Sequence, residues 1–186
     1  MAERREPERR GGAFYVGDVL IVNKSYPLDP SFGDGLTPET QAAFEALRDD
    51  AAKLGLTLEN NSGFRPYDYQ HKIYWEYVAE DGQALADTYS ARPGHSEHQT
   101  GLCFDLNSIS DEFAFTPEGQ WVNDNCWKYG LCIRFPKGKD AITGYQYEPW
   151  HLRLVGRELA EQLYNGGDWI SLEEYFGVES TYDRIR

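Results

Sequence analysis

Apolar residues recur at helical spacing in several segments of the chain, and the clearest begins at Thr37-Pro38-Glu39. A capping hydroxyl, a proline at the first helical position and an acid in the first turn predict a helix start there. Apolar side chains then recur three or four residues apart up to Leu54, and Gly55 stands where a helix ends. Ser171 and Glu174 form the capping box of a last helical turn. Similar signals predict helices over residues 67–80, 83–89, 117–129 and 155–164.

Short apolar runs predict strands between these helices. They lie at residues 19–22, 56–60, 102–107 and 131–135, and residues 144–151 are also expected to be extended. Helices and strands do not alternate as regular βαβ units, which favours an α+β fold with a central antiparallel sheet flanked by helices. Residues 1–12 are charged and show no periodicity. We therefore expect a mobile leader over 1–12 and a single domain over 13–186.

The composition is that of a globular, water-soluble chain. Of its 186 residues 40% are hydrophobic, and 18 basic residues against 31 acidic ones give a net charge of −13. Such a negative field disfavours nucleic acid and anionic lipid as partners. No run of eighteen apolar residues occurs, so we expect no membrane span. The N-terminus also lacks the apolar core of an export signal. The cysteines, expected to be free residues of the core, are Cys103, Cys126 and Cys132.

The candidate metal ligands come from two distant segments. His98 lies in a glycine-bounded loop, and Asp105 follows seven residues later in an otherwise apolar strand. A buried carboxylate without a partner is costly, so Asp105 requires a cation or several donors nearby. His151 supplies a third partner, because two imidazoles and one carboxylate leave one corner of a tetrahedral zinc site open, as in catalytic sites.

Glu148 precedes His151 by three residues, and a kink at Pro149 would let the two side chains converge. A carboxylate near a zinc-bound water can act as the general base of peptide hydrolysis. The alternative is that the four polar residues are unrelated, because the HExxH helix signature is absent.

The segment Ser96–Asp105 resembles the SxHxxGxAxD motif of the lysostaphin, D-Ala-D-Ala peptidase and hedgehog superfamily, and Glu148–His151 resembles its ExxH motif. The resemblance implies zinc held on the sheet by His98, Asp105 and His151, with Glu148 as catalytic base. Further segments resemble VanY-type D-alanyl-D-alanine carboxypeptidases in matching order, namely Val22-Asn23-Lys24, Pro27-Leu28, Ser62–Arg65, Gln70, Arg92–His95 and Thr143–Tyr145.

Cys103 departs from the motif, which has alanine at this position. We expect Cys103 to pack as a small apolar residue. A role as zinc ligand is geometrically awkward, because Cys103 is two residues from Asp105 and shares its face of the strand.

Three residues are candidates for substrate binding. Arg65 is placed to bind a terminal carboxylate or to stabilise the oxyanion. Gln70 and Ser96 match positions that contact substrate in similar enzymes; the alternatives are a helix-surface amide and a loop hydroxyl. The resemblance predicts a zinc metallopeptidase, a D-alanyl-D-alanine carboxypeptidase that removes the C-terminal D-alanine of peptidoglycan stem peptides ending in D-Ala-D-Ala.

Several alternatives remain open. One alternative is that the enzyme is an L,D-carboxypeptidase or an endopeptidase on the same polymer. Another is that the chain is a zinc-stabilised binding module without catalysis. The substrate favours an extracytoplasmic location with the export signal absent from this chain, and a cytoplasmic location is the alternative. Because both imidazoles must be neutral to ligate, we expect metal and activity to be lost together on acidification. The sequence carries no signal of oligomeric state.

Overall fold

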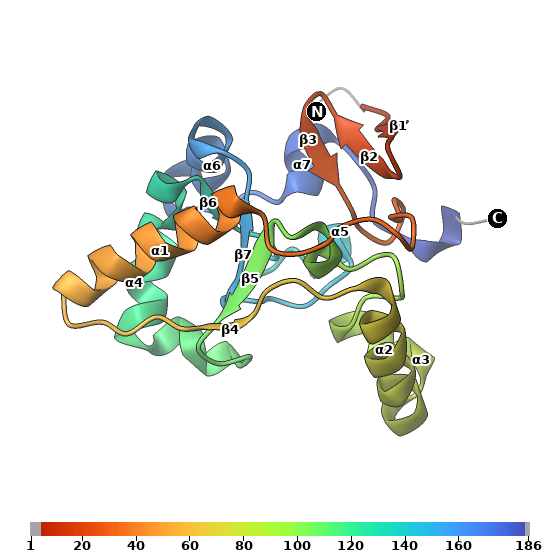
Figure 1. Ribbon diagram of the computed structural model, residues 1–186, viewed down its shortest axis with the longest axis horizontal. Coiled ribbons are helices and arrows are strands. Elements are labelled where there is room, and N and C mark those ends of the chain that lie inside the picture. The colour runs from red at the N-terminus through yellow and green to blue at the C-terminus, as the bar shows by residue number, and fades with distance from the viewer. Residues whose placement is uncertain (1–4, 185–186) are drawn as a thin grey trace.

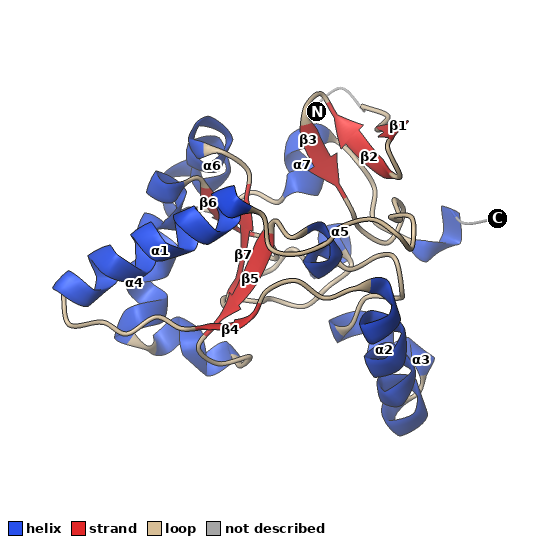
Figure 2. Ribbon diagram, in the orientation of Figure 1, coloured by secondary structure: helices blue, strands red, loops and turns tan. Residues whose placement is uncertain are grey.

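The computed structural model describes residues 5–184 and contains two antiparallel sheets, of which the larger has helices on both sides (Figures 1 and 2). The smaller sheet has the order β1 (Glu8–Arg10), β2 (Ala13–Val16), β3 (Val19–Ile21). The larger sheet has the order β4 (Asn60–Ser62), β5 (Cys103–Leu106), β7 (His151–Leu154), β6 (Leu131–Ile133). The helices are α1 (Pro38–Lys53), α2 (Tyr67–Asp81), α3 (Gln83–Tyr89), α4 (Pro117–Asn125), α5 (Asp140–Thr143), α6 (Arg157–Tyr164) and α7 (Leu172–Phe176). This architecture confirms the predicted α+β class with an antiparallel sheet flanked by helices.

The two faces of the central sheet differ in chemistry. Phe104 on β5 and Leu152 on β7 are register partners, and both belong to the main core with residues of α1, α4 and α6. Figure 1 shows these helices on one side of the sheet and α2 and α3 on the other. Because successive side chains of a strand alternate between faces, the opposite face of β5 and β7 carries polar residues and a thiol. They are Cys103, Asp105, His151 and Arg153.

The predicted capping signals are present. Thr37 caps α1 by accepting a hydrogen bond from the backbone of Thr40 at 3.2 Å. Ser171 and Glu174 make the expected capping box at the start of α7. Local side-chain chemistry therefore determines where these helices begin.

Other boundaries differ from the sequence-based expectation. Strand β4 begins at Asn60 rather than at residue 56. The helix expected to reach residue 129 becomes a 3-10 turn (η3, Cys126–Tyr129), because the α-helix α4 ends at Asn125. Within the leader expected over residues 1–12, strand β1 pairs with β2, so regular structure begins before the expected start of the domain. Residues 1–4 of that leader lie outside the described part of the chain.

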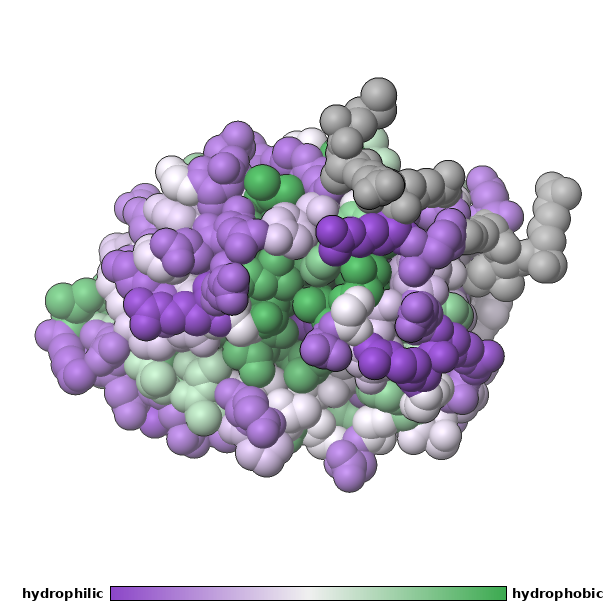
Figure 3. Space-filling view, turned by 90° about the horizontal axis from the view of Figure 1, so that it is seen from above, coloured by the Kyte–Doolittle hydropathy of each residue, from purple (hydrophilic) through white to green (hydrophobic). Residues whose placement is uncertain are grey.

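Polar residues occupy most of the face of the molecule shown in Figure 3, and apolar residues gather near the middle of that view. Within residues 5–184, no helix combines the length and the apolar composition that a membrane crossing requires.

Candidate active site

His98 is positioned by a short 3-10 helix, η1 (Glu97–Thr100), which precedes β5. The Ser96 hydroxyl caps η1 by accepting a hydrogen bond from the backbone N–H of His98 at 3.3 Å. On the His98 ring, Nδ1 lies 2.7 Å from the carbonyl oxygen of Gly63. Because a carbonyl only accepts hydrogen bonds, Nδ1 carries a hydrogen, and in the neutral ring the lone pair therefore lies on Nε2.

His151 and Glu148 converge because the chain turns between them. The backbone N–H of His151 donates to the carbonyl of Glu148 at 3.3 Å, and Pro149 occupies the second position of this turn, where proline is favoured. The expectation of an extended segment over 144–151 is therefore wrong at its end, whereas the kink at Pro149 is present. Glu148 Oε2 lies 3.3 Å from His151 Nδ1, and both residues are at least nine-tenths buried.

Asp105 lies between the two imidazoles. Its Oδ2 is 3.3 Å from His98 Nε2, and its Oδ1 is 3.4 Å from His151 Nδ1. Asp105 is 3% exposed, and Oδ1 accepts no hydrogen bond from the described residues. The structure thus brings together four side chains from η1, β5, the turn before β7 and β7 itself.

This donor set fits a zinc ion. Ligands about 2.0–2.1 Å from a tetrahedral metal stand roughly 3.4 Å from one another, which matches the two contacts of Asp105. Both imidazoles turn a nitrogen toward Asp105 while the other nitrogen is engaged elsewhere, as metal-bound histidines do. The Asp105 oxygen that lacks a hydrogen bond also requires a positive partner.

The electrostatics of the cluster follow from burial and close charges. Burial alone lowers the pKa of His98, but the charges on Cys103 and Asp105 outweigh it and raise that pKa to about 9. Burial alone raises the pKa of Asp105, but the charge of His98 holds it below its usual value. The site therefore favours ionised Asp105 beside a positive charge.

Cys103 joins this cluster. Ligand atoms of His98, Cys103 and His151 all lie within 4.8 Å of one another, and Cys103 is fully buried. Sharing a strand face with Asp105 brings the thiol to the imidazoles, rather than keeping it from them as we expected. Burial raises the pKa of Cys103, but the charges of His98 and His151 outweigh this effect and lower it.

The three expected substrate-binding residues line a cavity of ≈ 210 Å³. The same cavity is lined by His98, Asp105, Glu148 and His151. Arg65 Nη1 donates to Gln70 Oε1 at 2.9 Å, and Gln70 Nε2 donates to the carbonyl of Ala91 at 2.8 Å. Arg65 Nε is buried and has no hydrogen-bond partner among the described residues. Gln70 and Ser96 are buried, and their polar atoms hold Arg65 and η1. Both therefore help to build the site.

The sequence did not point to a buried ion network behind the site. Glu97, directly before His98, contacts His151 Nε2 and two arginines, Arg134 and Arg153. Burial alone raises the pKa of Glu97, but the charges of the two arginines hold it well below its usual range. These partners come from two segments far from Glu97 in the sequence, β7 and the residue directly after β6, so the only sequence signal of the network was a charged residue inside a motif.

The chain is similar in sequence to known carboxypeptidases. The family model VanY, D-alanyl-D-alanine carboxypeptidase, matches residues 33–157. The putative carboxypeptidase YodJ of Bacillus subtilis (strain 168) is 39% identical over 183 residues, covering 85% of this chain and 66% of the relative. A D-alanyl-D-alanine carboxypeptidase of Enterococcus faecium is 34% identical, covering 76% of this chain and 52% of the relative. The chain thus spans less than two thirds of the length of these relatives.

Two solved structures are similar over most of the chain. The LdcB LD-carboxypeptidase has a TM-score of 0.85 at 39% identity and covers 96% of this chain and 98% of its own. A vancomycin-resistance D,D-pentapeptidase VanY mutant, solved in complex with Zn(II), has a TM-score of 0.71 at 32% identity and covers 83% of this chain and 96% of its own.

Proposed function

Because this chain belongs to the VanY family of D-alanyl-D-alanine carboxypeptidases, we propose that it is a zinc-dependent carboxypeptidase that removes the C-terminal D-alanine from peptidoglycan stem peptides. The observation that carries this proposal is the convergence of His98, Asp105 and His151 with Glu148 at one cavity. The three ligand candidates would hold zinc, and Glu148 stands beside them as the base.

When bound, zinc supplies a Lewis acid that polarises the scissile carbonyl and lowers the pKa of a water molecule toward about 7. The Glu148 carboxylate takes a proton from the attacking water and returns it to the leaving amine as the C–N bond breaks. His98 and His151 must be neutral at the nitrogens that face Asp105, so acidification is expected to weaken zinc binding and turnover together.

Arg65 supplies the positive charge for the substrate. Its guanidinium lines the cavity and has a buried Nε without a hydrogen-bond partner among residues 5–184. Gln70 holds another part of this guanidinium by the Nη1 hydrogen bond. A donor held in this way is suited to a terminal carboxylate or to the oxyanion that forms during attack. Ser96 also lines the cavity and is proposed to contact the substrate.

Two terminal bonds fit this chemistry. The motifs resemble D,D-carboxypeptidases, whereas the solved LD-carboxypeptidase resembles this chain over more of its length than the D,D-pentapeptidase does. We therefore propose the L,D bond, in which D-alanine follows an L-centred diamino acid, as the preferred bond. The D,D bond is the second candidate. We propose that the activity lies on the cell-wall side, because peptidoglycan is the proposed substrate.

Mass spectrometry of two stem peptides tests the proposal. The zinc-loaded protein is incubated with a tetrapeptide stem, which ends in the L,D bond, and with a pentapeptide stem, which ends in D-Ala-D-Ala. Loss of one alanine from the tetrapeptide supports L,D activity, and loss from the pentapeptide alone supports D,D activity. An internal cut indicates an endopeptidase. Two intact peptides would contradict the carboxypeptidase and support a zinc-stabilised binding module.

A further inference from the structure

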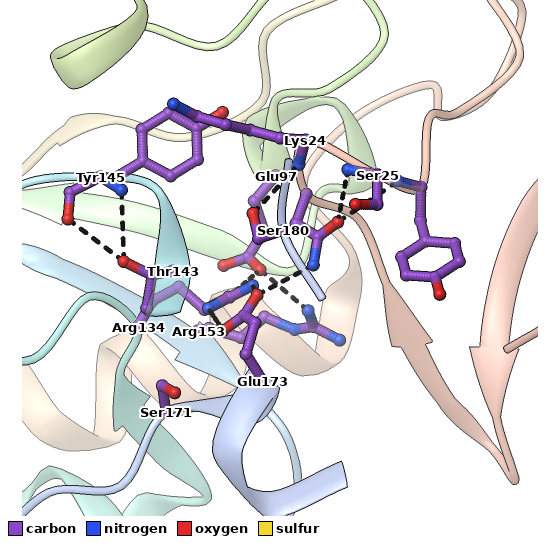
Figure 4. A network of polar contacts seen from close by, with 12 residues as sticks. Lys24, Ser25, Glu97, Arg134, Thr143, Tyr145, Arg153, Ser171, Glu173 and Ser180 are labelled. Atoms are coloured by element: carbon purple, nitrogen blue, oxygen red, sulfur yellow. Dashed lines mark hydrogen bonds and ion pairs between the residues drawn. The ribbon is translucent and has the colours of Figure 1, made fainter. Parts of the chain in front are cut away.

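Glu97 lies between His151 and two buried arginines. Figure 4 shows Glu97 with these arginines, Arg134 and Arg153, and with Glu173 beyond them. Glu97 Oε1 is 3.1 Å from His151 Nε2, and Glu97 Oε2 accepts hydrogen bonds from Arg134 Nε at 2.8 Å and Arg153 Nη1 at 3.0 Å. We propose that Glu97 is a positioning residue that fixes the tautomer and the orientation of His151, so that Nδ1 is the nitrogen offered to zinc. This inference rests on the proposed zinc site.

The arginines determine which carboxylate oxygen faces the imidazole. A guanidinium has only donors, so Arg134 and Arg153 both require an acceptor, and both find it in the same oxygen. The other oxygen is left for His151, and because it only accepts, Nε2 must carry the hydrogen. Nδ1 then keeps its lone pair, 3.4 Å from Asp105 Oδ1 and 3.3 Å from Glu148 Oε2.

The network is anchored at its far end. Arg134 donates to both carboxylate oxygens of Glu173 on α7, at 2.9 and 2.7 Å. Asn23 Nδ2 donates to the same carboxylate at 3.0 Å, and Arg153 Nη2 donates to the carbonyl of Leu20 on β3 at 2.9 Å. All these charged side chains are almost fully buried, so the carboxylate that faces His151 has little freedom to swing away.

The substitution Glu97→Gln separates positioning from packing. Glutamine has the same shape, but one of its two terminal atoms is an amide nitrogen, which only donates. The arginines keep the amide oxygen, so the nitrogen faces His151 and requires Nε2 to accept. The ring hydrogen then moves to Nδ1, where zinc needs a lone pair. We expect zinc affinity to fall by about 10- to 100-fold, the usual effect of losing the partner of a metal-bound histidine.

Glu173→Gln is the matched control. It removes the same charge from the same network, but Glu173 binds Arg134 and Asn23 and, among the described residues, makes no hydrogen bond or ion pair with His151. We expect it to lower the unfolding temperature while leaving zinc affinity unchanged. A purely structural role of Glu97 would instead make the two variants alike in both measurements.

The experiment measures zinc dissociation constants by competition with a chromophoric chelator and the unfolding temperatures of both variants. It also measures the ring ¹⁵N shifts of His151 in the zinc-loaded wild type. The proposal is supported if zinc binding is weaker in Glu97→Gln but not in Glu173→Gln, and if Nε2 of His151 carries the hydrogen in the wild type. Unchanged affinity in Glu97→Gln, or equal losses in both variants, overturns the proposal. Should Glu97→Gln fail to fold, the wild-type shifts decide, and hydrogen on Nδ1 refutes it.

These outcomes differ from failure of the proposed function. The wild-type protein could bind zinc through Nδ1 of His151 and yet release alanine from no stem peptide. That result would contradict the proposed carboxypeptidase activity while supporting the role of Glu97. A wild-type protein that binds no zinc would overturn both.

Discussion

Asp105 and His151 are register partners on the antiparallel strands β5 and β7, and Asp105 Oδ1 lies 3.4 Å from His151 Nδ1. Partners directly opposite on one face of such a pair have their Cβ atoms about 4.5–5.5 Å apart, close enough for two side chains to hold one ion. The backbone pairing of β5 with β7 therefore sets the spacing of two ligand candidates that are far apart in sequence.

Asp105→Asn is expected to remove most zinc binding without unfolding the protein. The amide keeps the shape of the side chain but loses the negative charge between two imidazoles. Loss of the hydrogen-bond partner of a metal-bound histidine costs about 10- to 100-fold in metal affinity, so the loss of a ligand's charge is expected to cost more than about 100-fold. Zinc titration measures the effect, with Asp111→Asn at an exposed position as control. Wild-type affinity in Asp105→Asn would exclude Asp105 as a ligand.

Glu148→Ala is expected to retain zinc and lose turnover. Glu148 is proposed as the base and is not one of the three ligand candidates. Removing a general base lowers the rate by about 10²- to 10⁴-fold. Zinc content by elemental analysis and alanine release from stem peptides are measured on the same preparation. Near-native release of alanine by this variant would refute the role of Glu148.

The helix starts were predictable because their signals are local, as at Thr37 and Ser171, whose hydroxyls bond the backbone three residues on. The ligand candidates were also visible in the sequence, because a carboxylate such as Asp105 in an apolar strand has to have a partner. What the sequence could not supply is contact between distant segments. Strand β1 pairs with β2 and is also tied to Asp29 by Arg9, and the role of Glu97 depends on Arg134 and on Arg153 of β7.

The surroundings of Cys103 also depend on contacts between distant segments, which the sequence could not supply. The sequence placed it correctly on the face of Asp105, but the direction of the thiol toward the imidazoles of His98 and His151 depends on how η1 and β7 pack around β5. The residues next to Cys103 in the sequence would be the same whether its thiol packs among apolar side chains or joins a metal cluster.

Gly101→Ala is expected to destabilise the protein strongly. Gly101 ends η1 with φ +71°, and an added Cβ would lie 2.0 Å from the carbonyl oxygen of Gly35. The left-handed conformation alone costs an alanine about 1–2 kcal/mol, and the backbone clash adds to it. Gly55→Ala is the control, because Gly55 has φ +77° and open space around its Cβ position. Urea unfolding should show the larger loss for Gly101→Ala; equal losses would mean that the clash relaxes without cost.

Cys103→Ala is expected to keep zinc and activity. The proposed ligands are His98, Asp105 and His151, and the motif itself has alanine at this position. The cobalt-substituted wild type should lack a thiolate-to-metal absorption band in the near ultraviolet. Cys126→Ala is the control, because Cys126 is equally buried but belongs to the main core. A cobalt band that disappears in Cys103→Ala alone would make the thiol a ligand and change the ligand count.

His95→Gln is expected to reduce the loss of stability in mild acid. Burial lowers the pKa of His95 and outweighs the hydrogen bond of its Nδ1 to the carbonyl of Asn23, which lies at 2.8 Å. The unfolded chain takes up a proton as the pH falls through about 6.5, whereas the folded chain resists it. The free energy of unfolding therefore falls below that pH, until the lowered pKa of the folded state is reached.

Glutamine cannot take up this proton, and its amide can donate to the same carbonyl. Urea unfolding at pH 7.5 and 5.5, with zinc at one saturating concentration, should show a smaller decrease for His95→Gln than for the wild type. His71→Gln, at an exposed position on α2, is expected to behave as the wild type. An equal decrease in all three proteins would mean that another buried group, and not His95, controls the acid sensitivity of the fold.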